Sequence, residues 1–343
     1  MAGVVRVAHQ VGIVGASGYG GAELVRMLAG HPDLDVAVIA ASSQAGRPVV
    51  ELFPNLAGDR VFDPIDVAGL MALDLVFLAT PHGPALELGA SLADAGTRVV
   101  DLSAAFRLTP GGFEHWYGEP HTRPDLAPAV YGLPEFHRKQ IADATLVANP
   151  GCYPTATLLG LRPLVSLVQP GSVVVDAKSG TSGAGRAAKD HLHFAHVDGD
   201  FVAYGAPAHR HTGEIEQHAG GDLGPVQFTP HLLPIARGLL ATIYATLADG
   251  VTAADVQQAF HDAYADEPFV HLLAPGTFPH TKAVAGSNGC QLSAIVDPRT
   301  NRVVVTSAID NLGKGAAGQA IQNANLMLGL PEATGLSSIG IYP

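Results

Sequence analysis

The sequence predicts an α/β protein with a Rossmann-type dinucleotide-binding domain, followed by a second α+β domain built on a largely antiparallel sheet. Three observations lead to this prediction. A glycine-rich loop follows the first apolar strand, near-continuous apolar strands alternate with helical patterns up to about residue 150, and strands outnumber helices beyond that point. A chain of 343 residues is long enough for two such domains.

Composition narrows the classes of protein that the chain can belong to. Hydrophobic residues make up 47% of the chain, charged residues 15%, and the net charge is -12. An acidic protein lacks the basic footprint of a nucleic-acid partner. We see no apolar run long enough to span a membrane and no secretory signal, so the sequence predicts a cytoplasmic protein without a membrane partner. The two cysteines, Cys152 and Cys290, are not expected to form a disulfide.

The first half alternates strands with helices. Continuous apolar runs of this kind indicate a parallel sheet covered on both faces. We expect strands at residues 11–15, 36–41, 73–80, 97–102 and 145–148, with helices over 23–28 and 85–95.

The second half has a different pattern, because several of its apolar runs alternate in polarity. Alternation is typical of antiparallel strands with one solvated face. We expect strands at 172–177, 227–233, 239–247, 290–296 and 302–309, with helices over 158–165, 253–264 and 314–328.

The loop after the first strand has the spacing G-x-x-G-x-x-G, formed by Gly15, Gly18 and Gly21. Glycines permit a tight turn there and let the backbone approach a pyrophosphate, which the N-terminus of the following helix then binds. An ordinary glycine-rich turn is the alternative, but the strand-loop-helix frame favours a cofactor site. The candidate cofactor-binding residues of this loop are Gly15, Ser17, Gly18, Tyr19 and Gly20.

The end of the second strand favours NADP(H) over NAD. Residues 40–47 carry no carboxylate for the ribose hydroxyls, whereas Ser42, Ser43 and Arg47 suit a 2′-phosphate. Pro81 and His82 follow the third strand, where loops of a parallel sheet face the cofactor, although His82 fits an exposed loop imidazole equally well.

Cys152 is the candidate nucleophile. It lies between a strand and an apolar helical run, and Pro154 suits a first helical turn, so Cys152 is expected at or just before a helix N-terminus. The positive end of a helix stabilises the thiolate, which is the reactive form. The alternative is a buried structural cysteine, which is our interpretation of Cys290.

A nucleophilic cysteine needs a base, and residues 209–214 (HRHTGE) are the best candidates. On an extended segment His209 and His211 share a face. Arg210 could then bind an anion, and Glu214 could orient an imidazole. A zinc site is the alternative, but the sequence contains no H-E-x-x-H or C-x-x-C. We therefore expect no metal, and surface or packing roles for His191, His193 and His196.

Small residues and glycines at 178–186 expose backbone N–H groups that suit phosphate or carboxylate. Ser179 and Gly180 are candidates for the cofactor, and Ser182 and Arg186 for the substrate. Arg107 is a further anion-binding candidate.

Taken together, these motifs resemble the N-acetyl-gamma-glutamyl-phosphate reductases of arginine biosynthesis over nearly the whole chain. The matching segments are GASGYGGAEL at 15–24, LATPHG at 78–83, DLSAAFRL at 101–108, YGLPE at 131–135, NPGCYPTA at 149–156, SGTSGAGR at 179–186, HRHTGEI at 209–215 and DNLGKGAAGQA at 310–320.

The resemblance implies an oxidoreductase that reduces an acyl phosphate to an aldehyde with NADPH, through a thioester on Cys152. It implies His209 as the acid/base, with His211 and Glu214 as neighbours and Asn311 near the nicotinamide. The unperturbed pKa of a histidine lies near neutrality, where one residue can both donate and accept protons. It also implies a second domain like that of aspartate-semialdehyde dehydrogenase, and a homodimer or homotetramer. The expected domains are 1–150 for NADP binding, 151–312 for catalysis and oligomerisation, and 313–343 as a C-terminal helix returning to the first domain.

Two departures from the family pattern affect neighbouring residues. The family commonly has Asp where this chain has Ala105, which could change how Arg107 is held. It commonly has Pro where this chain has Gly213, which could loosen the segment carrying His211.

Three other functions remain open. One is a reductase of a carrier-linked aminoadipyl phosphate in lysine biosynthesis, although Tyr153-Pro154 favours the glutamyl branch. The others are a Cys-His hydrolase, which needs no dinucleotide, and an NADP-sensing regulator, which needs no nucleophile.

Overall fold

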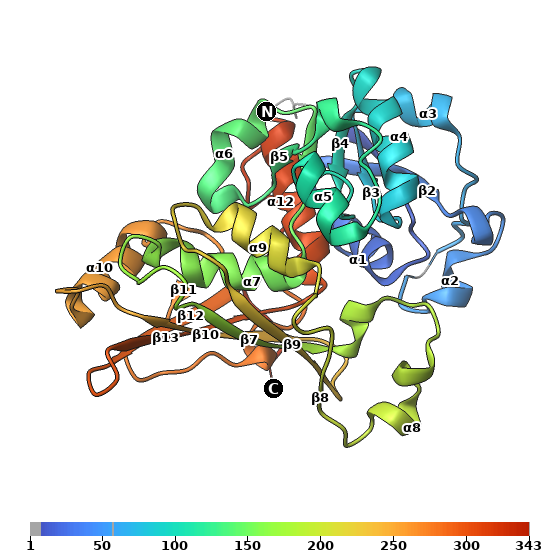
Figure 1. Ribbon diagram of the computed structural model, residues 1–343. Coiled ribbons are helices and arrows are strands. Elements are labelled where there is room, and N and C mark those ends of the chain that lie inside the picture. The colour runs from blue at the N-terminus through green and yellow to red at the C-terminus, as the bar shows by residue number, and fades with distance from the viewer. Residues whose placement is uncertain (1–7, 57, 343) are drawn as a thin grey trace, which may run out of the picture. The chain divides into compact units, whose positions relative to one another are not determined.

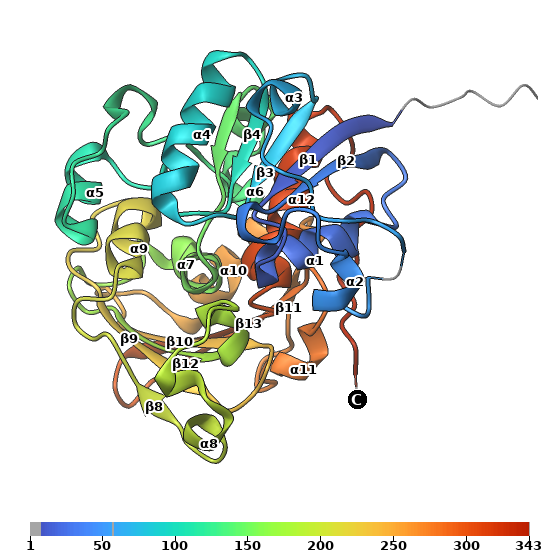
Figure 2. The ribbon, with the colours of Figure 1, turned by 90° about the vertical axis from the view of Figure 1, so that its right-hand side faces the viewer.

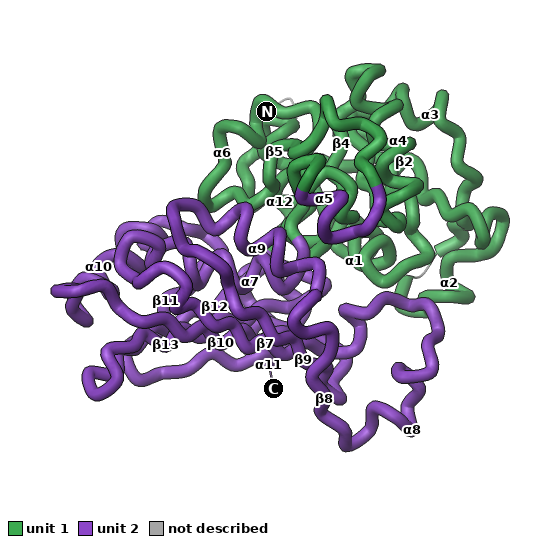
Figure 3. Tube along the Cα trace, in the orientation of Figure 1, with its two compact units in different colours: residues 1–111, 120–150, 316–336 green, residues 112–119, 151–315, 337–343 purple. Residues whose placement is uncertain are grey.

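The computed structural model describes residues 8–56 and 58–342. The chain divides into two compact units, coloured separately in Figure 3. Unit 1 comprises residues 1–111, 120–150 and 316–336, and unit 2 comprises residues 112–119, 151–315 and 337–343. The predicted domain limits at 150 and 312 stay predictions.

Unit 1 contains a parallel sheet with the strand order β2-β1-β3-β4-β6-β5 (Figure 1). Every pairing in it is parallel. The order reverses at β1, whose neighbours are β2 and β3, and ligands of open α/β sheets bind at such a reversal. The strands are β1 (His9–Val14), β2 (Leu34–Ala40), β3 (Leu75–Leu78), β4 (Arg98–Asp101), β5 (Val130–Tyr131) and β6 (Leu146–Ala148).

Helices cover both faces of this sheet, and Figure 2 shows α4 and α12 on opposite sides of it. Alternate strand residues supply the two cores: Phe77 packs with residues of α1, α6 and α12, whereas Val76 and Leu78 pack with residues of α3 and α4. The strands are buried on both faces, which explains their continuous apolar sequences. The helices are α1 (Tyr19–Leu28), α2 (Val49–Leu52), α3 (Val67–Met71), α4 (His82–Asp94), α6 (Pro134–Ala142) and α12 (Gly318–Met327).

Unit 2 contains a mixed sheet with the order β11-β12-β13-β10-β7-β9-β8. The pairs β12–β13, β13–β10, β10–β7 and β9–β8 are antiparallel, while β11–β12 and β7–β9 are parallel. The sheet is therefore largely antiparallel, as predicted. Its strands are β7 (Val174–Gly180), β8 (Val202–Ala203), β9 (Gln227–Leu233), β10 (Leu239–Thr246), β11 (Val270–Leu272), β12 (Cys290–Asp297) and β13 (Arg302–Ile309).

One face of this sheet carries α7, which contacts β10 and β13 and is itself contacted by α9. Gly160 of α7 allows this close packing, because a Cβ there would lie 2.7 Å from Ile243 Cδ1 on β10. From Tyr153 to Leu161 every residue of α7 is buried, so the helix that carries Cys152 is rigidly held. The helices of unit 2 are α5 (Pro110–Tyr117), whose first two residues belong to unit 1, α7 (Cys152–Leu161), α8 (Phe194–Val197), α9 (His211–Ala219), α10 (Ala253–Tyr264) and α11 (Thr281–Val284).

The structure confirms the predicted fold class. The helix at 253–264 and the strands at 227–233 and 302–309 have the predicted limits. The helix expected over 158–165 begins earlier, at Cys152. The helix expected over 314–328 is a π-helical turn, Gly313–Ala317, that runs into α12. In the part of the chain that the structure describes, every helix is too short or too polar to span a membrane.

Candidate active site

The glycine loop of unit 1 connects β1 to α1 and has little room for side chains. Gly15 has a φ of 86°, a conformation that favours glycine. A Cβ on Gly21 would clash with Gly15 O and would lie 2.6 Å from Ala16 Cα. No side chain caps α1, and its first turn carries no acidic residue. The free N–H groups at this helix start therefore fit the pyrophosphate of a dinucleotide.

The three residues predicted to select a 2′-phosphate follow β2. Ser42 and Ser43 form an exposed 3₁₀ turn, η1 (Ser42–Gln44). Arg47 is exposed as well, and its Nε donates to Glu51 Oε2 at 2.9 Å. Because both partners of this pair are exposed, the ion pair costs little to separate when an anion competes for the arginine.

Pro81 and His82 lie where β3 ends, and they form the start of α4: Pro81 is the N-cap and His82 the first residue. Near them lies Asp101, the last residue of β4, which is fully buried. Burial raises the pKa of Asp101 to about 6, although hydrogen bonds from Ser103 and the positive charges of Arg107 and His82 oppose the shift. The carboxyl end of the sheet thus carries a titratable group that the sequence-based prediction missed.

Arg107 is 6% exposed and is held by backbone carbonyls. Its Nε donates to Asn149 O at 2.8 Å and its Nη2 to Leu102 O at 2.7 Å. The missing carboxylate at Ala105 therefore does not leave the guanidinium loose. The substrate-binding role of Arg107 stays a prediction, while its visible contacts fix the backbone three residues before Cys152.

Cys152 is the first residue of α7, with Gly151 as the N-cap. Glu214 of α9 fixes this cap, because its Oε1 accepts the Gly151 N–H at 2.8 Å. Thr155 also bonds to the cap: its N–H and its hydroxyl both donate to Gly151 O. A Cβ on Gly315 would lie 2.8 Å from Cys152 Cβ, so only glycine fits beside the cysteine. The helix N-terminus stabilises negative charge on Sγ.

The two histidines do not lie on an extended segment, and the prediction that they share a strand face was wrong. His211 is the first residue of α9, and Arg210, in αR conformation, is its N-cap. Their rings are nevertheless neighbours, with centroids 4.9 Å apart. The His211 N–H donates to His209 Nδ1 at 3.2 Å, so Nδ1 is an acceptor and the neutral ring of His209 carries its proton on Nε2.

The surroundings of His209 shift its pKa away from the near-neutral value of an unperturbed histidine. Burial lowers the pKa of His209 to about 4, the positive charge of Arg210 lowers it further, and Glu214 acts in the opposite direction. Aromatic rings account for the burial: Tyr153, Tyr204 and Phe228 all lie edge-on to His209, with centroids 5.4–5.9 Å away. His209 is therefore a neutral imidazole at physiological pH in this state.

Two tyrosines missed by the sequence-based prediction complete this aromatic cluster. Tyr204 donates its hydroxyl hydrogen to the Tyr153 hydroxyl at 3.2 Å, and Tyr153 in turn donates to His231 O at 2.9 Å. Burial raises the pKa of both tyrosines, and the neighbouring Cys152 raises it further. Both hydroxyls therefore stay protonated, and the tyrosines present hydrogen-bonding groups near the sulfur.

The segment after β7 gathers the remaining candidates of unit 2. Asn311 Nδ2 donates to Ser182 Oγ at 2.8 Å, and Asn311 Oδ1 accepts the Gly238 N–H at 2.8 Å. Ser179 and Gly180 are the last residues of β7 rather than part of a loop, and a Cβ on Gly180 would lie 2.8 Å from Ile235 O. Asn311, Ser182 and the end of β7 therefore form one hydrogen-bonded group.

A buried carboxylate, also missed, holds the turn that carries Asn311 and Gly315. Asp310 Oδ1 accepts the N–H groups of Leu312 and Gly313, while Asp310 Oδ2 accepts from Arg237 at 3.0 Å. The sequence offered one signal for it, since Asp310 begins the quoted motif at 310–320. No local pattern indicated Tyr204, whose partners lie elsewhere in the chain.

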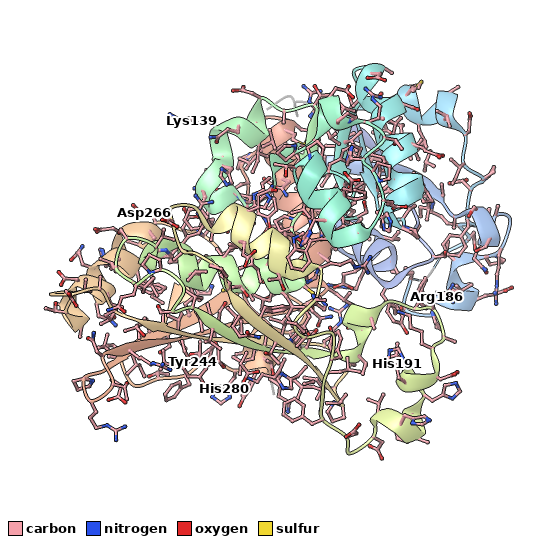
Figure 4. The ribbon with its side chains drawn as sticks, viewed as in Figure 1. Lys139, Arg186, His191, Tyr244, Asp266 and His280 are labelled. Atoms are coloured by element: carbon pink, nitrogen blue, oxygen red, sulfur yellow. The ribbon has the colours of Figure 1, made fainter. Side chains whose placement is uncertain are left out.

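The exposed candidates lie at the edge of unit 2. Figure 4 labels Arg186 and His191 on the segment between β7 and β8, which projects from the sheet edge. His191, His193 and His196 are all exposed, as expected of surface residues.

Arg210 is exposed and lies over the ring of Tyr117, 4.8 Å from its centroid. Among residues 8–56 and 58–342, no group of three or more His, Cys, Asp or Glu side chains could hold a metal ion.

Comparison with known proteins places both units in one class. The family model "Semialdehyde dehydrogenase, NAD binding domain" matches residues 10–144, and "Semialdehyde dehydrogenase, dimerisation domain" matches residues 152–311. The chain therefore belongs to the semialdehyde dehydrogenase family. The match confirms the predicted oxidoreductase class and the dinucleotide cofactor of unit 1, for which NADP(H) is the expected form.

Curated relatives with similar sequences narrow the family to one named enzyme. The N-acetyl-gamma-glutamyl-phosphate reductase of Desulforamulus reducens is 47% identical over 344 residues, covering 97% of this chain and 99% of the relative. The enzyme of the same name from Brevibacillus brevis is 48% identical over 344 residues, with the same coverage. These relatives confirm the resemblance found in the sequence.

Solved structures support the fold. Aspartate semialdehyde dehydrogenase II of Vibrio cholerae has a TM-score of 0.71 at 16% identity, covering 94% of this chain and 98% of that one. The Candida albicans aspartate semialdehyde dehydrogenase with NADP has a TM-score of 0.72 at 17% identity, with the same coverage. At such low identity the likeness concerns the fold alone.

Proposed function

We propose that this chain reduces N-acetyl-L-glutamyl 5-phosphate to N-acetyl-L-glutamate 5-semialdehyde and phosphate, with NADPH as the reductant. The observation that carries the proposal is Cys152 at the start of α7, with its cap fixed by Glu214, in a chain whose curated relatives bear the name of that activity. A nucleophilic role explains why Cys152 is half-buried while the rest of α7 is buried.

The first step that we propose is attack by the Cys152 thiolate on the acyl carbon. A bond forms between Sγ and that carbon, the bond to the phosphate oxygen breaks, and phosphate leaves with the electron pair. The first turn of α7 begins at Cys152, and backbone N–H groups at a helix start can stabilise an oxyanion. The Gly151 N–H is already bonded to Glu214, so it orients the turn instead.

NADPH, when bound, supplies the hydride that reduces the thioester. We propose that the N-terminus of α1 binds its pyrophosphate and that Ser42, Ser43 and Arg47 select the 2′-phosphate. Arg107, Ser182, Arg186 and Arg210 are the proposed anion-binding residues for substrate, and Ser179, Gly180, Asn311, Pro81 and His82 the remaining proposed cofactor contacts.

His209 handles protons in this proposal. As a neutral ring with its proton on Nε2, it donates a hydrogen bond to the oxygen that becomes the aldehyde. When the bond between Sγ and the carbon breaks, Cys152 leaves as the thiolate with the electron pair and the oxygen forms the C=O double bond, so this step requires no proton to be transferred to His209. His211 supports His209 through the backbone bond to Nδ1.

The experiment runs the reaction backwards, with N-acetyl-glutamate semialdehyde, phosphate and NADP, and follows the absorbance of NADPH. We expect phosphate-dependent NADPH formation that exceeds the rate with aminoadipate semialdehyde. A faster reaction with the longer aldehyde would favour the lysine-branch alternative. Absence of NADPH from either aldehyde, with folded protein, would overturn the reductase proposal in favour of a hydrolase or a sensor.

A cytoplasmic homo-oligomer is the setting that we propose for this activity. The family model of residues 152–311 is described as a dimerisation domain, which supports self-association. Light scattering that gives twice or four times the chain mass of 35.3 kDa would support a dimer or a tetramer.

A further inference from the structure

The last turn of α5 packs against the first turn of α9 within unit 2. Trp116 lies over Gly213, where a Cβ would lie 2.6 Å from the indole Cε2 and closer still to Nε1 and Cδ1. Tyr117 contacts Arg210, the residue before α9. Two consecutive aromatic residues of α5 therefore contact Arg210 and Gly213, which flank His211 in the sequence. Position 213 has no room for a side chain while the indole stays in place.

The aromatic pair is anchored rather than loosely placed on the surface. Phe113, one turn earlier on α5, is 1% exposed. Its ring stacks on that of Tyr117, with centroids 4.7 Å apart and an angle of 8° between the planes. Residues four apart face the same side of a helix, so Phe113 ties Tyr117 to the core. Tyr117 is thus held in place, and Trp116 beside it contacts the first turn of α9.

The turn of α9 that Trp116 contacts carries two groups of the candidate active site. His211 bonds to His209 Nδ1, and Glu214 accepts the Gly151 N–H at the cap of α7. A shift of this turn would move Glu214 away from the cap and expose the start of α7. The contacts therefore run from Trp116 to Gly213, along the turn to Glu214, and from there to the helix that begins with Cys152.

We propose that Trp116 is a positioning residue that acts through Gly213: its indole fixes the first turn of α9, and Glu214 transmits that placement to the cap of the Cys152 helix. In this chain Gly213 leaves room for the indole, which a side chain at that position would displace. The kinetic consequence rests on the proposed function, whereas the consequence for Cys152 reactivity does not.

The primary test is Gly213→Ala, with Gly111→Ala as the matched control. Gly111 lies on α5 with open space around its Cβ position, so its replacement should change nothing. For Gly213→Ala we expect kcat to fall at least tenfold with little change in the KM for NADPH. Alkylation of Cys152 by iodoacetamide at neutral pH should slow at least threefold, because a displaced cap weakens the helix N-terminus that stabilises the thiolate.

The fluorescence of Trp116 gives a readout independent of catalysis, because it is the only tryptophan in the chain. In Gly213→Ala its emission should shift to the red while circular dichroism stays native, since the indole is pushed toward water. An unshifted emission with unchanged alkylation would overturn the proposal, whether or not the reductase assay succeeds.

A double variant separates positioning from general damage. Trp116→Ala should lower kcat and the alkylation rate by similar factors while the protein stays folded. Adding Gly213→Ala to it should cost nothing more, because the indole that the new methyl group displaces is already gone. Effects that multiply in the double variant, or a Trp116→Ala protein with normal alkylation and kcat, would refute the proposal. Trp116→Ala also serves as the test if Gly213→Ala does not fold.

Discussion

At the scale of single residues, the placement of Cys152 depends on its neighbours more than on its own side chain. Glu214 binds the cap N–H, Gly315 leaves room for the cysteine, and Tyr153 and Tyr204 line its surroundings. A carboxylate that binds a backbone N–H at a helix start is a strong, charge-assisted contact. The reactive geometry is therefore set by groups that do not themselves react.

Replacing Glu214 tests this dependence. Glu214→Ala leaves the buried Gly151 N–H without this acceptor, which costs about 1–3 kcal/mol of stability. Because the start of α7 is then no longer fixed, we expect kcat to fall by roughly 10- to 100-fold, a barrier increase of about 1.4–2.7 kcal/mol. Glu214→Gln keeps an acceptor oxygen and should recover most of the loss. Steady-state rates for the three proteins provide the measurement, and equal losses in the two variants would contradict the role given to the cap.

The lowered pKa of His209 predicts a pH dependence of stability. In the folded protein the pKa of His209 is about 4, below the value of 6.5 in the unfolded chain. The unfolded chain therefore binds more protons between about pH 4 and pH 6.5. The contribution of His209 to stability is therefore complete above pH 6.5 and lost as the pH falls toward 4. His209→Asn should flatten the fall of the melting temperature over this window. An unchanged pH profile in that variant would show that His209 is not buried as described.

A site residue could be predicted from the sequence where its role depends on residues next to it in the chain. The cysteine and its helix start were predictable, because Pro154 and the apolar run lie beside Cys152. Tyr204 and Trp116 were not, because their contacts join residues distant in sequence. The lowered pKa of His209 was also not predicted, because the aromatic rings that bury it come from three separate segments of the chain.

At the scale of elements, strands and helices with clear periodicity were predictable, and a short polar segment was not. Burial alternates strictly along β10, as expected of a strand with one buried face, although the partly exposed face includes Leu240 and Tyr244. The segment at 209–214 has two histidines two apart, which suggests a strand, yet Thr212, Gly213 and Glu214 are buried in the first turn of a helix. Contacts with α7 and Trp116 decide its conformation, and these are absent from the local sequence.

The loop between β1 and α1 provides a test at this scale. Gly21→Ala introduces a methyl group where Gly15 O lies, so the loop must shift away from the place proposed for the pyrophosphate. We expect the Kd for NADPH, measured by titration, to rise at least tenfold while Cys152 alkylation stays normal. Gly30→Ala, whose Cβ meets open space just beyond α1, is the control. Normal NADPH affinity in Gly21→Ala would remove this loop from the cofactor site.

At the scale of the whole molecule, the chain crosses between its two units several times. Residues 112–119 and 337–343 belong to unit 2, and residues 316–336 to unit 1. The alternation of strands and helices in the first half and the strand-rich second half could be predicted from periodicity. The short segment at 112–119 could not, because nothing in its sequence shows which core its aromatic residues join.

The central claim is that Cys152 forms the thioester, and the reverse reaction without phosphate tests it most directly. With N-acetyl-glutamate semialdehyde and NADP alone, the thioester has no phosphate to release it, so it should accumulate. We expect a burst of one NADPH per chain and an N-acetylglutamyl adduct on the peptide of Cys152, both absent in Cys152→Ser. Steady turnover without any adduct, or an adduct on Cys290 instead, would contradict the account.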